Sequence, residues 1–151
     1  MSYPDDIFAS TSRILETPGD TITLEWPHAG LWLPVAMRLD GVGEGSTEAV
    51  FGHIDLIRDG IAYTMCYVYQ EDRNTEPWAV TFRLANNFME WQSTYTFGVL
   101  PRCPVRKGDQ FVAVLENPEG RGYLTALHVT AIQLGALKRS LYKDAVGYIT
   151  I

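Results

Sequence analysis

The stretch GHIDLIRDGIAYTMCYVY, residues 52–69, decides the fold class, because it reads as two β-strands joined by a tight turn. Asp59-Gly60 is a dipeptide favoured in two-residue hairpin turns, whose central residues need positive φ. A turn at these two residues fixes the register, so that Arg58 faces Ile61. The sequence therefore predicts an antiparallel hairpin in which side chains alternate between two faces.

One predicted face of this hairpin is apolar at every step, and we interpret it as the core face. Its expected cross-strand pairs are Val50 with Tyr69, Gly52 with Tyr67, Ile54 with Met65 and Leu56 with Tyr63. The glycine at position 52 leaves room for the opposing ring to lie across its partner strand. The alternative is that Tyr63, Tyr67 and Tyr69 form a platform on which a sugar stacks.

The opposite face of the hairpin places His53 across from Cys66, with Asp55 on the same side. A catalytic cysteine needs a lowered pKa, a base within reach and donors for an oxyanion. His53 is a candidate base, and Asp55 is positioned to orient it. A regular sheet is flat, however, and neither a helix N-terminus nor a glycine-rich elbow supplies oxyanion donors here. We therefore predict a solvated or interface face, and a protein that is not an enzyme.

Apolar residues also alternate with polar ones along most of the remaining chain, which is the pattern of half-buried strands. Pro34 lies inside one such run and cannot donate to a ladder, so that strand is expected to be an edge or to carry a bulge. Two runs, residues 109–117 and 122–134, are apolar on both faces and are predicted to be central strands. The alternating runs are residues 21–26, 31–39, 77–84 and 93–100.

The two ends of the chain do not follow this alternation. Residues 1–19 are predicted to form an N-terminal arm with one or two helical turns over 3–15, and residues 136–151 a C-terminal tail. The sandwich domain is expected over residues 20–135. Apolar arms either pack on their own domain or reach a neighbouring subunit, and the sequence leaves both open. The residues assigned to the assembly arm are Ile7, Phe8, Ile14 and Leu15.

Composition excludes several classes of protein. The 151 residues carry a net charge of −6 and no basic run, which disfavours nucleic-acid binding. The start has no cationic and apolar signal, and no stretch approaches the roughly 18 apolar residues of a spanning helix. We therefore expect a protein made in a host cytoplasm, with no secretion signal and no membrane span. His28, His53 and His128 lie on separate elements, so no metal and no cofactor is predicted.

The segments PVRKGDQFVAVLEN and GRGYLTALHVTAIQL, within residues 93–134, resemble the late strands of jelly-roll domains. A basic residue followed by Gly-Asp and a long apolar strand is similar to the C1q/TNF-like pattern. Related sandwiches occur in bacteriophage capsid subunits, decoration proteins and fibre heads. The resemblance implies an all-β, antiparallel, jelly-roll-like β-sandwich of about eight strands. It also implies that Gly108 and Asp109 make the turn into one strand of a trimer-forming sheet.

Two functions follow from these patterns. The first is a non-enzymatic virion structural protein, such as a capsid, decoration or spike subunit, that forms a homo-oligomer, with a trimer favoured, and contacts other virion proteins. The alternative is a glycan- or receptor-binding module, because exposed aromatic rings stack on sugars. Its candidate binding residues, which are also candidate interface anchors, are Trp32, Trp91 and Tyr123.

Overall fold

The computed structural model describes residues 7–43, 50–70, 77–84, 97–116 and 122–135. Nearly all of these residues belong to β-strands. The strands are β1 (Phe8–Gly19), β2 (Thr21–Glu25), β3 (Leu31–Gly43), β4 (Val50–Arg58), β5 (Ile61–Gln70), β6 (Pro77–Leu84), β7 (Phe97–Leu100), β8 (Val105–Arg106), β9 (Gln110–Glu116) and β10 (Gly122–Gln133). The predicted C-terminal tail at 136–151 lies outside the described residues.

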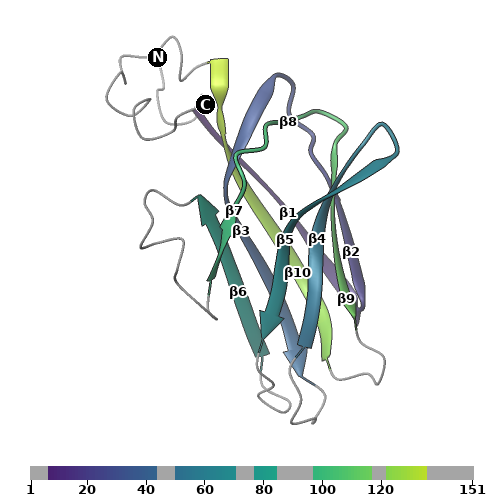
Figure 1. Ribbon diagram of the computed structural model, residues 1–151. Helices are drawn as coiled ribbons and strands as arrows, with labels where there is room; N and C mark the ends of the chain where they lie inside the picture. Colours follow the sequence, from purple (N-terminus) through teal and green to yellow (C-terminus); the bar gives the residue numbers. More distant parts are fainter. Residues whose placement is uncertain (1–6, 44–49, 71–76, 85–96, 117–121, 136–151) are drawn as a thin grey trace.

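Two sheets face each other and form a sandwich (Figure 1). One has the order β1-β10-β3-β6-β7 with β8 on β3, and the other has the order β2-β9-β4-β5. The antiparallel pairs β4–β5, β3–β6, β2–β9 and β1–β10 are nested one outside the next along the chain. Nested pairing across two sheets is the topology of a jelly roll. The predicted all-β, jelly-roll-like sandwich is therefore confirmed.

Two features depart from a regular eight-stranded antiparallel sandwich. Between β6 and β9 the chain adds two short strands, β7 and β8. The β7 strand pairs with β6 in parallel, whereas every other pair is antiparallel. The predicted central strands are confirmed, because β9 lies between β2 and β4 and β10 lies between β1 and β3.

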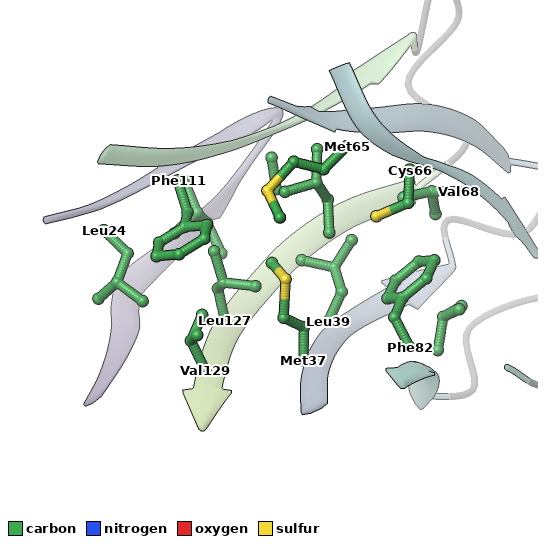
Figure 2. Packing of buried hydrophobic residues seen from close by; sticks show 14 of the residues in the cluster. Leu24, Met37, Leu39, Met65, Cys66, Val68, Phe82, Phe111, Leu127 and Val129 are labelled. Atoms are coloured by element: carbon green, nitrogen blue, oxygen red, sulfur yellow. The ribbon is translucent and has the colours of Figure 1, made fainter. Parts of the chain in front are cut away.

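The core lies between the two sheets, where alternate residues of each strand meet. Ile22, Leu24 and Trp26 are 1%, 5% and 0% exposed, as their spacing predicted. Side chains of the opposite sheet, among them Met37 and Phe82, meet them and their neighbours in one continuous cluster. Figure 2 shows these side chains interdigitating between the layers. Burial of this cluster supplies most of the driving force for folding.

Pro34 is accommodated by a bulge, not by an edge position. The β3 strand is central in its sheet, but its register with β10 shifts by one residue between Ala36 and Pro34. Pairing with β6 begins only at Ala36, so the missing N–H of the proline does not interrupt that ladder. The extra residue reverses which side chains point inward, and Trp32 therefore faces the core in place of Leu31.

Most of the predicted N-terminal arm is a strand of the sandwich. Residues Phe8–Gly19 form β1, which pairs with β10 from Phe8 to Ile14. Ile7 packs with Leu33, and Leu15 packs against the main core, so these two residues fold back onto their own domain. Phe8 and Ile14 remain 49% and 71% exposed. From Phe8 onward the helical turns expected over 3–15 are wrong, because pairing with β10 overrides a weak local preference.

The turn into β9 is held by a buried ion pair that the sequence did not predict. Gly108 has φ of 95°, which suits glycine, and Asp109 is 3% exposed. Nε of Arg58 donates to both carboxylate oxygens of Asp109 at 3.2 and 3.1 Å, and its Nη2 donates to the Pro104 carbonyl at 2.8 Å. The Arg106 N–H donates to the same carboxylate at 3.0 Å. These contacts join the end of β4 to the β8–β9 turn.

Candidate functional site

The β4–β5 hairpin has the predicted turn and, near that turn, the predicted register. Asp59 and Gly60 have φ of 52° and 78°, as a type I′ turn requires. Pairing follows the expected order from the turn up to Asp55 opposite Thr64. A β-bulge then shifts the register by one residue, and Met65 is the extra residue on β5. Every pair beyond the bulge therefore differs from the prediction.

The bulge separates the cysteine from the histidine and the carboxylate. Met65 and Cys66 both point into the core, where they are 8% and 7% exposed, and Figure 2 shows both side chains among the buried residues between the sheets. His53 pairs with Tyr67 and faces outward on the other side of the sheet. The juxtaposition of Cys66, His53 and Asp55 that the simple register gives is therefore wrong.

Cys66 also has the wrong acidity for a nucleophile. Burial, with a smaller contribution from the negative charge of Asp55, raises the pKa of the Cys66 thiol to about 12. A reactive cysteine needs the opposite shift, because the thiolate is the attacking species. Cys66 behaves as a small apolar side chain of the core.

We expect Cys66 to resist alkylation in the folded protein. At pH 8 a thiol with a pKa of about 12 is ionised in only about one molecule in ten thousand, and the sulfur is also buried. Iodoacetamide should modify the half-buried Cys103 first, and Cys66 only after unfolding in urea, as peptide mass spectrometry would show. Modification of native Cys66 faster than a free thiol would reopen the question of a catalytic cysteine.

The outward side of β4 and β5 carries a patch of exposed aromatic rings. Tyr67 is 79% exposed, and Phe51 and Tyr69 are 45% and 36% exposed. The last two rings meet edge to face with centroids 5.3 Å apart. The prediction that Tyr67 and Tyr69 pack in the core is wrong, because the Met65 bulge turns both outward. Gly52 accordingly faces Val68, not Tyr67.

Polar groups lie beside these rings. His53 Nε2 is 3.4 Å from Asp55 Oδ2, and Thr64 Oγ1 donates to Asp55 Oδ1 at 2.8 Å. The outward side chains of the neighbouring β9 are Gln110, Val112, Val114 and Glu116. The patch therefore combines aromatic faces with an oriented carboxylate. This combination suits the binding of a cationic or hydroxyl-bearing partner better than it suits catalysis.

A second row of polar side chains crosses the outward side of the other sheet. Ser12 Oγ lies 2.8 Å from His128 Nδ1, and His128 Nε2 lies 3.2 Å from Asp40 Oδ2. Arg38 Nε donates to Asp40 Oδ1 at 2.7 Å. Sequence reasoning missed this row because its members lie on β1, β10 and β3, far apart in the chain. In the sequence, the one indication of this row is that each member occupies a position that faces outward on its strand.

The row has the connectivity of a serine–histidine–aspartate triad but lies flat on the sheet. Ser12 is exposed, and the backbone N–H groups around His128 belong to the β1–β10 and β10–β3 ladders. Hydrolysis also needs donors aimed at an oxyanion beside the nucleophile. We interpret the row as a set of cross-strand contacts that joins three strands.

Trp32 and Tyr123, two of the three predicted binding residues, lie at opposite ends of the β3–β10 pair. Trp32 is 7% exposed, and its Nε1 donates to the Ala29 carbonyl at 2.9 Å. Its ring packs against Trp26, so the expectation of an exposed Trp32 is wrong, and the Pro34 bulge is the reason. Tyr123 is half-buried opposite Val42 at one end of β10. Trp91 lies outside the described residues.

The described part of the chain has neither a metal-binding cluster nor a helix suited to a membrane. No group of three or more histidine, cysteine, aspartate or glutamate side chains there is arranged to hold a metal ion. No helix in the described ranges is long and apolar enough to cross a membrane.

Comparison with known proteins yields structural neighbours only. No family model and no curated protein matches the chain. An isomalto-dextranase of Arthrobacter globiformis T6, in complex with panose, has a TM-score of 0.39 and 12% identity over 72% of this chain, which spans 15% of the dextranase. The Drosophila NLP core, whose structure concerns pentamer formation and histone binding, has a TM-score of 0.36 and 11% identity over 83% of this chain and 96% of its own. At this level of similarity neither neighbour assigns a function.

Proposed function

We propose that this chain is a non-enzymatic structural subunit of a virion that assembles with copies of itself. The observation that carries the proposal is the edge strand β1, which is 12 residues long and has Ile14 71% exposed. Within the described residues, no strand pairs with its other side. A long edge with exposed apolar side chains is a template for pairing with another chain, and monomeric proteins usually block it.

The virion context is the part of the proposal that rests on the jelly-roll fold. Jelly rolls are common in viral capsid proteins, but a fold alone does not fix a function. A homo-oligomer with a trimer favoured, contacts to other virion proteins and a place in the virion are parts of the same proposal.

Self-assembly through β1 is best tested by a point substitution. Deleting residues 1–15 would remove most of β1 and uncover β10, so the domain itself would be damaged. Ile14→Lys leaves the strand intact and places a charge on the exposed edge, which is how natural edges avoid pairing. We expect the wild-type chain to have an oligomeric mass by light scattering and the Ile14→Lys variant to have a lower one.

Ile61→Lys is the matched control, because Ile61 is 55% exposed and lies at the turn of the other sheet. It should keep the wild-type mass. A wild-type monomer, or equal loss of mass in both variants, would contradict assembly through β1.

A glycan- or receptor-binding module is the second candidate, and Tyr67 is the observation that favours it. A ring that is 79% exposed beside an oriented carboxylate is suited to stacking on a pyranose. This candidate moves the binding residues from Trp32 to the outward side of β4 and β5. A glycan array with the wild-type chain and a Tyr67→Ala control tests it: signals that disappear in the variant support it, and an array without signals refutes it.

A further inference from the structure

The outward side of the β2-β9-β4-β5 sheet is acidic and aromatic, and we name it the acidic face. Its carboxylates are Glu25, Asp55 and Glu116. Arg58 is the only lysine or arginine within these four strands, and it is turned inward to Asp109. The exposed rings of Phe51, Tyr67 and Tyr69 lie on the same side. The acidic face therefore offers negative charge and aromatic faces, the combination that attracts guanidinium groups.

The outward side of β10, β3 and β6 has the opposite character, and we name it the basic face. Arg38 and Arg83 point outward there, and Asp40 is the only carboxylate within these three strands. Asp40 forms an ion pair with Arg38, and its Oδ2 also lies 3.2 Å from His128 Nε2. The Arg38 side chain is still 60% exposed. A guanidinium held in place by its own neighbours loses little freedom when it meets a partner.

We propose that the acidic face of one copy docks on the basic face of the next, so that copies stack head to tail. This inference rests on the proposed self-assembly and names a second contact surface for it. Contact between two acidic faces would bring carboxylates together without a cation, and like charges across an interface are unfavourable. A neutral sugar would leave the three carboxylates without a counter-charge, so charge complementarity favours a second copy.

The two faces lie on opposite sides of the sandwich, and this placement determines the form of the assembly. A head-to-tail contact between opposed faces repeats in one direction and does not close into a ring. Because packed sheets lie about 10 Å apart, each copy adds about 20 Å to the stack. The β1 edge points sideways from this direction, so pairing at β1 and stacking of faces do not compete.

The test uses one substitution on each face. Arg38→Glu reverses the charge of the basic face, and Tyr67→Lys replaces a ring of the acidic face with a cation; both side chains are exposed, and circular dichroism checks the fold. By sedimentation velocity in low salt, we expect each variant alone to associate at least about tenfold more weakly than wild type. An equimolar mixture should recover association, because each variant keeps the face that the other has lost.

Each alternative outcome identifies which proposal fails. Unchanged association of Arg38→Glu alone would overturn head-to-tail stacking while leaving self-assembly through another surface. A wild-type chain that is monomeric in low salt would overturn both proposals. If Ile14→Lys loses mass but still stacks, the β1 edge and the two faces are independent contact surfaces, as both proposals expect. Binding of a neutral glycan at Tyr67 without any association would assign the acidic face to a sugar. Association of the Ile14→Lys variant that persists at 1 M salt, where screening acts within about 3 Å, would refute an electrostatic contact, because that variant lacks pairing at β1.

Discussion

Replacing Asp109 with alanine is expected to lower the free energy of unfolding by about 3 kcal/mol. Asp109 is 3% exposed and accepts hydrogen bonds from Arg58 and from the Arg106 N–H. Without it, the Arg58 guanidinium stays partly buried and loses the carboxylate that pairs with it directly. Urea denaturation at pH 7 measures the effect, which is a large share of the 5–15 kcal/mol typical of a domain.

The same ion pair predicts a pH dependence. Burial by itself raises the pKa of Asp109, but hydrogen bonds from Arg58 and Arg106 outweigh it, so that the pKa is lowered from 3.8. The stabilisation is therefore complete above about pH 4, where the carboxyl ionises in the unfolded chain, and is lost as pH falls through the lower folded-state pKa. The difference in stability between wild type and Asp109→Ala should shrink below pH 4.

Asp59→Asn is the control for Asp109→Ala, because asparagine removes the charge and still suits the positive φ of the turn. Asp59 also pairs with an arginine, Arg106, at 3.3 Å, but its side chain is 79% exposed. Exposed pairs contribute little, so the control should change stability by less than about 1 kcal/mol. Equal changes in the free energy of unfolding would show that burial adds nothing to the stabilisation by the Arg58–Asp109 ion pair.

Gly52→Ala is expected to destabilise the protein by about 3 kcal/mol through steric overlap. A Cβ built on Gly52 overlaps the Val114 carbonyl oxygen and lies 3.2 Å from the Leu115 Cα. Both atoms belong to the backbone of the central strand β9, which cannot move without disturbing two ladders. Thermal unfolding followed by circular dichroism would show the loss as a fall of several degrees in Tm.

Gly135→Ala serves as the control for this prediction. A Cβ on Gly135 meets nothing within 4 Å, and Gly135 is not among the residues with positive φ. The substitution should change stability by no more than about 0.5 kcal/mol. A Gly52→Ala variant as stable as this control would mean that the two sheet strands lie farther apart than the structure places them.

The sequence predicted the fold class because alternation and turn chemistry act locally. Ile22, Leu24 and Trp26 are buried as their spacing required, and Asp59-Gly60 makes the expected turn. The candidate site was not predictable in the same way. A bulge such as the one at Met65 has no obligatory residue type, and its single inserted residue reverses the face of everything beyond it.

β1 was missed for a related reason. Its outward residues, Ser10 and Ser12 among them, face solvent, and Ile14 is exposed although it is apolar. A strand is recognised in a sequence when apolar residues of its buried face alternate with polar ones. An edge strand whose two faces both reach water shows this alternation only weakly. The polar row formed by Ser12, His128 and Asp40 is invisible for the same reason, since its members become neighbours only when β1, β10 and β3 align.

The nested pairing also implies the order in which the strand pairs form during folding. The β4–β5 hairpin closes across a two-residue turn, whereas Ser10 and Thr130, which bond across β1 and β10, are 120 residues apart. Closing a loop costs more entropy as it lengthens, so pairing should proceed from the innermost hairpin outward. β1 is then the last strand to dock, and until it does, β10 offers an open side to the first strand of any other molecule nearby.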